Sequence, residues 1–222
     1  DGLEQLLDGE GLPAGHLIPW FRPLAACWTR SAILNQELPG GKWSKSAQGQ
    51  FRFLVGHLLR LSRPDGSAVL AQGAAAGACP PLLQAALRAA DDSDAWQYAA
   101  TLNDGKLGLA GPLQDRAPKG LKPLSDKTQA GYSSEWAEFA LLRPNWDRKS
   151  PSLAVRYDGE QVQAELNAGG QVLLAGTLET EVRVDGQRLM PGKDWACVCW
   201  ESDADVDYLE LELALGKDVR LQ

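Results

Sequence analysis

The sequence is poor in the residues from which catalytic and metal sites are most often built. It holds only two histidines among 222 residues. His16 and His57 are isolated, with no cysteine or carboxylate at ligand spacing, so we expect no metal site and no bound cofactor. Each histidine is expected to have a structural hydrogen-bonding role; the alternative is an acid or base in a cleft, because imidazole titrates near neutrality.

Cysteine is also scarce. Four cysteines are too few for a disulfide scaffold in a chain of this length, and they leave the compartment open. Two of them, Cys197 and Cys199, share a face of a predicted strand without being placed to bond each other easily. We interpret all four as buried apolar thiols, the alternative being a metal or redox role: Cys27, Cys79, Cys197 and Cys199.

No apolar run approaches the roughly 18 to 20 residues that a membrane-spanning helix needs. The chain also lacks a basic stripe. Residues 132–222 hold 9 Lys and Arg against 17 Asp and Glu, a net charge of -8 within a total of -7. An acidic half argues against binding to nucleic acid or to an anionic membrane, and we expect neither partner.

Complete catalytic and metal-binding motifs are missing as well. The glycine-rich string at 40–46 departs from the phosphate-loop motif, because Gln36 and Trp43 stand where that motif needs glycine and serine or threonine. No Gly-x-Ser-x-Gly occurs, so a hydrolase nucleophile is unsupported. The acidic run at 201–207 lacks the glycine and the glutamate of a calcium loop. The catalytic residues therefore stay unknown.

What the sequence does contain is a clear strand pattern in its last third. Segment 208–215 alternates leucine with other residues, which places Leu209, Leu211, Leu213 and Leu215 on one face of a strand. Asp-Gly, Gly-Gly and Pro-Gly pairs separate further short apolar segments, as in antiparallel sheets. The predicted strands cover 153–157, 162–166, 171–176, 178–184, 195–200, 208–215 and 219–222.

The first half reads as helical. Helices are predicted over 23–38, 47–62, 80–90 and 95–101, with a loop at 12–20 and a brief extended piece at 67–71. The apolar stripe of the first helix is expected to contain Leu24, Cys27, Trp28, Ser31 and Leu34. That of the second is expected to contain Phe51, Leu54, Val55 and Leu58. Residues 103–131 carry prolines and glycines without periodicity and are the expected domain boundary.

These patterns predict an α+β fold. We expect a small helical N-terminal unit with a loop-rich connector at 1–131, packed on an antiparallel β-sandwich, or part of one, at 132–222. A chain of this length can bury a sizeable core as one large or two modest domains.

Tryptophan is unusually frequent, with eight residues, at positions 20, 28, 43, 96, 136, 146, 195 and 200. A flat indole can stack on a sugar ring, but it is also an ordinary core or interface anchor. The predicted substrate-binding residues are Arg143, Trp146 and Asp147, which cluster beside a strand end. Solvent exposure separates the two interpretations, since a sugar site must be open.

Two long segments, 133–159 and 193–213, resemble the β region of heparinase II/III-like bacterial proteins. The likeness extends more faintly to 19–31 with 51–66. The resemblance implies a helical toroid before a β-sandwich, and lyase activity that cleaves uronic-acid polysaccharides by β-elimination with Tyr and His. The helical part here is too short for a full toroid and no Tyr/His motif matches, so no catalytic residue carries over.

The resemblance and the tryptophans together predict a polysaccharide-associated protein: a relative of these lyases, or a fragment or non-catalytic portion of one. If it is an enzyme, the expected activity is β-elimination in the intact protein. The expected partners are an acidic or neutral polysaccharide and the remainder of a larger chain, because a predicted strand runs to the end of the sequence. The alternative is a structural or protein-interaction module without catalytic activity.

Overall fold

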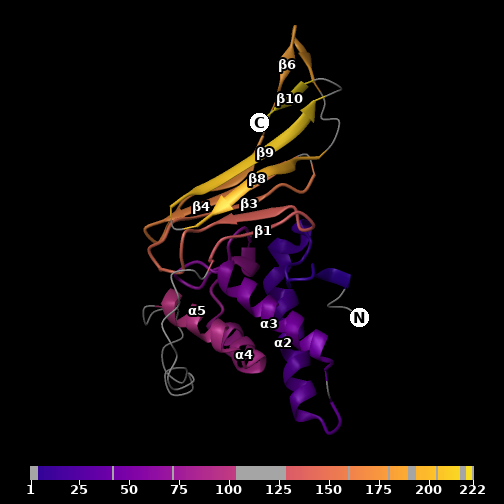
Figure 1. The fold of residues 1–222 in the computed structure, drawn as a ribbon, viewed down its shortest axis with the longest axis vertical. Coiled ribbons are helices and arrows are strands. Elements are labelled where there is room, and N and C mark those ends of the chain that lie inside the picture. Colours follow the sequence, from indigo (N-terminus) through magenta and orange to yellow (C-terminus); the bar gives the residue numbers. More distant parts are fainter. Residues whose placement is uncertain are drawn as a thin grey trace. The chain divides into compact units, whose positions relative to one another are not determined.

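The computed structural model describes residues 5–41, 43–71, 73–103, 129–159, 161–179, 181–189, 194–203, 205–215 and 219–221. The fold is α+β, as predicted, with helices in the first half and antiparallel sheets in the second (Figure 1). The chain divides into a helical unit, Asp1–Thr128 with Trp146–Lys149, and a sheet unit, Gln129–Asn145 with Ser150–Gln222. Most of the predicted connector at 103–131 lies outside the described residues.

The first long helix, α2 (Phe21–Glu37), begins two residues before Pro23, directly after the 3-10 helix η1 (Gly15–Trp20) in the segment predicted to be loop. Its buried face is formed by Phe21, Arg22, Ala25, Thr29 and Ala32. The prediction for this face was wrong, because Leu34 and Cys27 are exposed. Helix α2 carries two stripes at helical spacing, and the one with small alanines allows close packing.

The remaining helices follow the predictions closely. They are α3 (Lys45–Arg60), α4 (Pro80–Ala90) and α5 (Ser93–Asn103). Helix α3 begins at the cap Ser44, whose hydroxyl accepts the Ala47 N–H at 3.1 Å, and it buries the predicted stripe from Phe51 to Leu58. The segment at 67–71 forms only the isolated bridge Ser62↔Ala68 and is followed by the 3-10 helix η2 (Gly73–Ala76).

A buried arginine ties this unit together. The guanidinium of Arg22 donates to the carbonyl of Gly77, to the Ser62 hydroxyl at 3.3 Å and to the Gly66 carbonyl at 2.6 Å. Burial lowers the pKa of Arg22 from its ordinary value, against a rise from nearby Cys79. The side chain therefore fixes two loops to the start of α2.

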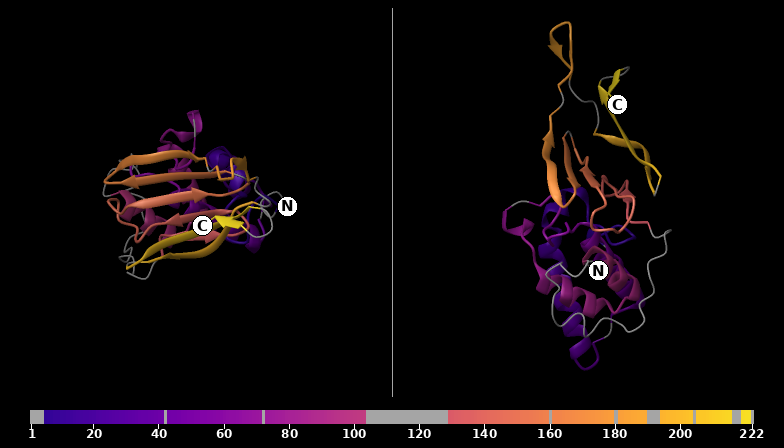
Figure 2. Two further views of the ribbon diagram at one scale, coloured as in Figure 1. Left: turned by 90° about the horizontal axis from the view of Figure 1, so that it is seen from above. Right: turned by 90° about the vertical axis from the view of Figure 1, so that its left-hand side faces the viewer.

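The main sheet is antiparallel throughout, in the order β1-β2-β3-β4-β5 (Figure 2). Its strands are β1 (Tyr132–Ser134), β2 (Phe139–Leu142), β3 (Ser152–Arg156), β4 (Val162–Ala168) and β5 (Gln171–Leu178). Strands β1 and β2 are not among the strands predicted from the sequence. Strand β2 is buried along its whole length and so lacks the alternation that reveals a strand.

The remaining strands form two smaller sheets. Their bounds are β6 (Arg183–Val184), β7 (Gln187–Arg188), β8 (Ala196–Ser202), β9 (Asp207–Leu215) and β10 (Val219–Leu221). Strand order is β10-β9-β8 in one sheet and β6-β7 in the other. The strand predicted at 178–184 is interrupted: β5 ends at Leu178 and β6 begins at Arg183 as half of a hairpin.

The two larger sheets share an apolar layer, as expected for a sandwich. On the side of the five-stranded sheet, the buried residues of this layer come from β2, β3 and β4 and from the residue that follows β3. They are Ala140, Val155, Tyr157, Val162 and Ala164. The side chains that pack against them from β8, β9 and their surroundings include Trp195, Cys197, Trp200, Leu209 and Leu211. Further along β9, Leu213 and Leu215 are buried. The inward leucine face predicted for β9 is confirmed.

Ser202 joins the end of β8 to the neighbouring backbone. Its hydroxyl donates to the Asp207 carboxylate at 2.6 Å and accepts the Arg143 N–H at 2.9 Å. Gly131 lies so close that a Cβ at that position would collide with the Ser202 hydroxyl. This point of the sheet unit therefore requires a glycine and a small hydroxyl side chain together.

Candidate functional site

The structure buries the tryptophan of the predicted sugar site. The Trp146 side chain is 3% exposed and lies flat on the Tyr98 ring, with centroids 4.2 Å apart and planes at 4°. The Arg60 guanidinium lies 5.5 Å from the same indole. A sugar needs an open aromatic face, so this geometry favours the anchor interpretation for Trp146.

The other two predicted residues differ from each other in exposure. Arg143 is 4% exposed, and its Nε donates to the carbonyl of Asn145 at 3.1 Å. Asp147 is exposed, and its carboxylate accepts the Lys149 N–H at 2.8 Å. Both side chains therefore form hydrogen bonds within the loop at 143–149 and help to orient it. Of the three predicted residues, only Asp147 is open to solvent.

The histidines also lie in contrasting places. His57 on α3 is buried, and its Nε2 is 3.0 Å from the carbonyl oxygen of Glu10. Burial, and then the charge of Arg60, lower the His57 pKa well below its ordinary value, so the ring is neutral. His16, in contrast, is exposed. The hydrogen-bonding role predicted for a structural histidine fits His57.

Two tyrosines, the partly buried Tyr98 and the buried Tyr157, are poorly suited to act as bases. Burial raises the pKa of Tyr98, which is covered by Trp146. Burial also raises the pKa of Tyr157 strongly, with nearby Cys197 contributing to the rise. A tyrosine that abstracts a proton must first become a phenolate, which a raised pKa opposes.

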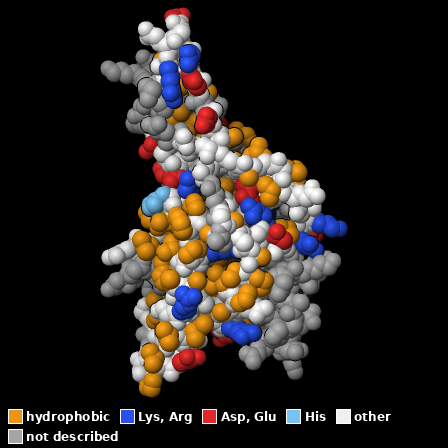
Figure 3. Space-filling model, turned by 180° about the vertical axis from the view of Figure 1, so that it is seen from behind, with side chains coloured by type: hydrophobic (Ala, Val, Ile, Leu, Met, Phe, Trp, Pro, Cys, Tyr) orange, Lys and Arg blue, Asp and Glu red, His pale blue; other side chains and the backbone are white. Residues whose placement is uncertain are grey.

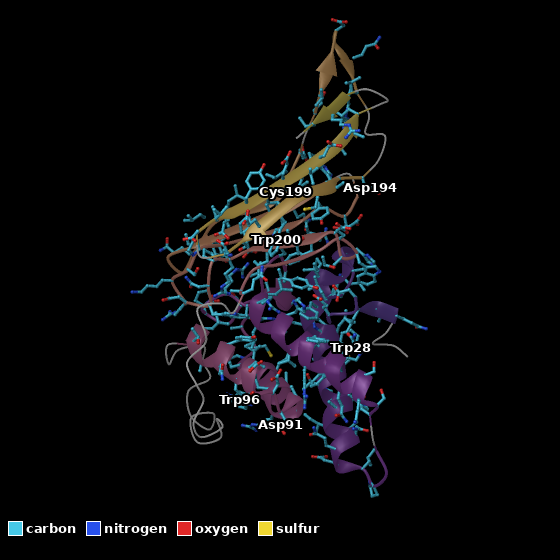
Figure 4. All side chains as sticks on the ribbon, viewed as in Figure 1. Trp28, Asp91, Trp96, Asp194, Cys199 and Trp200 are labelled. Carbon is cyan, nitrogen blue, oxygen red and sulfur yellow. The ribbon has the colours of Figure 1, made fainter. Side chains whose placement is uncertain are left out.

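The cysteines are not buried as predicted. Three of them are exposed, and Cys197 is partly exposed: the exposed ones are Cys27, Cys79 and Cys199 (Figure 4 shows Cys199 beside Trp200 on β8). Cys27 was placed on the wrong face of α2. In β8 a register shift pairs Cys197 with Leu211 on the packed face and Cys199 with Glu210 on the other face, so the two cysteines do not share a face as predicted. Within the described part of the chain, no cluster of His, Cys, Asp and Glu could hold a metal ion.

A cavity lies within the helical unit. A pocket of about 190 Å³ opens among α2, the start of α3 and the end of α4. Its polar lining residues are Asn35, Gln36, Gln48, Arg52 and Asp91, and its aromatic ones are Trp43 and Phe51. We call it the three-helix pocket.

The indole of Trp43 is held in place by its neighbours. It meets Phe51 edge to face, with ring centroids 5.6 Å apart and planes at 83°. The Gln48 side chain donates to the Trp43 carbonyl at 3.2 Å. Trp43 stays partly exposed and directly precedes the cap of α3. The pocket thus has an ordered aromatic wall that solvent can reach.

The opposite side of the pocket is the end of α4. Gln36 donates to the Ala89 carbonyl at 3.0 Å, and the Arg52 Nε donates to the Ala90 carbonyl at 3.3 Å. Both bonds satisfy carbonyls that a helix end leaves without partners. Asp91 follows with φ of 48° and ends the helix, and its side chain is exposed (Figure 4). A guanidinium, a carboxylate and amides therefore surround one aromatic wall.

Sequence reasoning counted Trp43 among the eight tryptophans but did not assign it to a site. The signal that points to it is a cap serine immediately after the indole, because a helix start fixes the residue before it. The other pocket residues come from three helices, and no spacing in the sequence brings them together.

Exposed apolar side chains form the other notable surfaces. Hydrophobic side chains gather over the helical unit in Figure 3, and the large exposed ones in that unit include Leu6, Trp20, Leu34, Leu38 and Phe53. In the sheet unit, every residue of β5 is exposed. Among the described helices none has the length and apolarity to span a bilayer.

Comparison with protein-family models, curated proteins and solved structures finds no match to this chain. The resemblance to heparinase II/III-like proteins therefore stays a prediction. The geometry of the described residues alone supports the functional proposals that follow.

Proposed function

We propose that this protein binds a polysaccharide and holds one sugar unit in the three-helix pocket. The observation that carries the proposal is the ordered, partly exposed indole of Trp43 beside hydrogen-bonding side chains. Sugar rings combine an apolar C–H face with a rim of hydroxyls. An aromatic wall with a polar rim is complementary to both.

The polar rim offers both kinds of hydrogen-bonding group. The Asp91 carboxylate accepts from sugar hydroxyls, and the Asn35 amide both donates and accepts. Asp91 is also fixed at the end of α4 by its backbone, whose N–H donates to the Leu87 carbonyl. A rim anchored to helix ends loses little freedom when a ligand binds.

Arg52 favours an acidic sugar. Its Nε is occupied by the Ala90 carbonyl, and a guanidinium has further N–H donors that suit a carboxylate. A uronate would place its carboxylate on Arg52 and its ring on Trp43. A neutral sugar would keep the stacking and lose only the ion pair.

The size of the pocket limits what enters it. Its volume of about 190 Å³ is below the roughly 300 to 1,000 Å³ typical of sites for drug-sized ligands. One sugar unit would fit, with the rest of the chain on the surface. Among the described lining residues none is Tyr or His, so we propose binding at this pocket and assign it no elimination step.

Glycan-array binding with soluble acidic and neutral polysaccharides tests the proposal. The wild-type protein should bind at least one acidic polysaccharide, and Arg52→Gln should weaken that binding about 10-fold or more, from the loss of a charge-assisted bond. Arg88→Gln, an exposed arginine on α4, is the matched control and should bind normally. No binding to any glycan, or equal loss in both variants, would remove the proposal.

A second assay separates binding from cleavage. Incubation with uronic-acid polysaccharides while ultraviolet absorbance is recorded detects the unsaturated product of β-elimination. The proposal predicts no increase in absorbance with this chain. An increase that survives Arg52→Gln would point to a lyase site elsewhere in the protein.

The second candidate function is a protein-interaction module without catalytic activity. The observation that favours it is the uncharged strand β5, which is exposed along its whole length. A chain that binds no glycan but associates with protein would match this candidate.

A further inference from the structure

Strand β5 is an edge strand whose side chains are all open to solvent. It pairs with β4 on one side only, and Leu173, at 62%, is its most exposed large residue. An edge strand presents a row of backbone N–H and C=O groups that can pair with another strand. A long apolar edge of this kind is unusual in a protein that acts alone.

The strand also lacks the usual protection against such pairing. Its sequence, Gln171–Leu178, contains no charged residue and no proline. The register shift opposite Leu166/Asn167 lies at its start and leaves Leu174–Leu178 in regular alignment with β4. The regular half is therefore free of the charges and prolines that natural edge strands use to block pairing.

We propose that a second copy of this chain pairs with the first through β5, strand to strand and antiparallel, about a two-fold axis at Gly176. The five-stranded sheet then continues from one copy into the other. The inference does not depend on polysaccharide binding; it rests on the protein-interaction candidate and names its partner.

The register follows from the side chains. Leu174 pairs with Leu166, and Leu178 with Val162, so both leucines lie on the face of the sheet that carries the apolar layer. A two-fold axis at Gly176 sets Leu174 of the first copy opposite Leu178 of the second copy. It likewise sets Leu178 of the first copy opposite Leu174 of the second. Two leucine pairs then extend the apolar face across the junction.

Gly176 suits the centre of such a contact. A Cβ at this position would meet nothing within 4 Å, so the face of the sheet is open at Gly176. Glycine weakens the interior of a strand and often marks a place where another backbone approaches closely.

The charges confine such a contact to β5 and favour the antiparallel direction. Residues 132–222 carry a net charge of -8, so two copies repel each other over most of their sheet units. The uncharged β5 avoids this repulsion. In the antiparallel register Glu179 faces Leu173 of the second copy, whereas parallel pairing would align Glu179 with Glu179.

The contact covers one strand edge and is small for a protein interface. Interfaces under roughly 1,200 Å² are generally weak or transient. We therefore expect a dimer that forms in the micromolar concentration range. Sedimentation velocity from about 1 to 100 μM should show the mass rising from 23.9 kDa towards twice that value.

Charged substitutions at Leu174 and Leu178 test the register. Leu174→Lys and Leu178→Lys should each weaken dimerisation about 10-fold or more, because each disrupts both symmetry-related pairs. The double variant Leu174→Lys/Leu178→Glu places opposite charges across the junction and should recover dimerisation. Val198→Lys, at a residue of similar exposure (53%) on β8, is the control and should dimerise normally.

A monomer throughout the concentration range would overturn the proposal, as would single variants that dimerise like the wild type. Failure of the double variant to recover would overturn the register about Gly176. Hydrogen exchange of the wild-type protein checks the result without any substitution: amides of Leu174–Leu178 should become protected as concentration rises. Unchanged exchange in a dimer would place the contact elsewhere and contradict the inference.

Discussion

The indole of Trp146 lies parallel to the phenol ring of Tyr98, at 4.2 Å between ring centroids. Trp146 follows β2 in the chain, yet Trp146–Lys149 belongs to the helical unit. The burial of Trp146 favours a structural role for this side chain. Trp146, which was predicted to bind sugar, is buried, whereas Trp43 is partly exposed, as sugar binding requires.

Replacement of the buried indole should destabilise the protein. Trp146→Ala removes a large side chain from a closed site and should cost about 3 to 5 kcal/mol of unfolding free energy. Tyr98→Phe keeps the stacked ring and should cost far less. Urea denaturation measures both. Trp20→Ala, at an indole that is 61% exposed, is the control; an equal loss there would contradict the assignment of Trp146 as an anchor.

Acid should weaken the protein through His57. Its folded pKa is lowered, so below about pH 6.5 the unfolded chain takes up a proton that the folded chain does not. Stability therefore falls as pH falls from 7.5 to 5.5, by on the order of 1 kcal/mol. Denaturation at the two pH values should show this loss in the wild type and in His16→Gln, but less of it in His57→Gln. A loss of the same size in His57→Gln would assign it to other groups.

Arg22 should be irreplaceable even by lysine. Its planar guanidinium reaches the Gly66 and Gly77 carbonyls and the Ser62 hydroxyl at once, which an ammonium cannot reproduce. Arg22→Lys should lower the unfolding free energy by about 2 to 3 kcal/mol. Arg30→Lys, on the exposed side of α2, should change it by less than about 0.5 kcal/mol. Similar thermal denaturation of the two variants would show that the network contributes little.

Gly131 and Ser202 should respond differently to small substitutions. Ser202→Ala leaves the Arg143 N–H without its hydroxyl acceptor and should cost about 1 to 3 kcal/mol. Gly131→Ala forces a collision with the Ser202 hydroxyl and should cost at least as much. Ser150→Ala, at a partly exposed serine outside this contact, is the control. The stability of each variant is measured by thermal denaturation. If Gly131→Ala were as stable as the wild type, the backbone at Gly131 would relax freely and the predicted collision would not occur.

The sequence predicted the fold class because its strongest patterns are local. The leucine alternation of β9 and the stripe of α3 each follow from one element burying one face. Helix α2 was harder, since it carries two stripes, and periodicity cannot say which of them meets a neighbour. The fully buried β2 was missed because it has no polar face to mark it.

The candidate site was less predictable than the fold. Trp146 and Trp43 look alike in the sequence, and each stands near charged residues. Their difference in exposure depends on Tyr98 for one and Phe51 for the other, which are tertiary contacts. The edge exposure of β5 likewise depends on strand order, which its uncharged sequence does not reveal.

Calorimetric titration of an acidic oligosaccharide into three proteins tests the proposed function most directly. The wild type and Trp146→Phe should bind with the same affinity, whereas Trp43→Ala should bind about 10-fold more weakly or worse, because it loses the stacking face. Equal affinity of Trp43→Ala and the wild type, or a loss confined to Trp146→Phe, would contradict binding in the three-helix pocket.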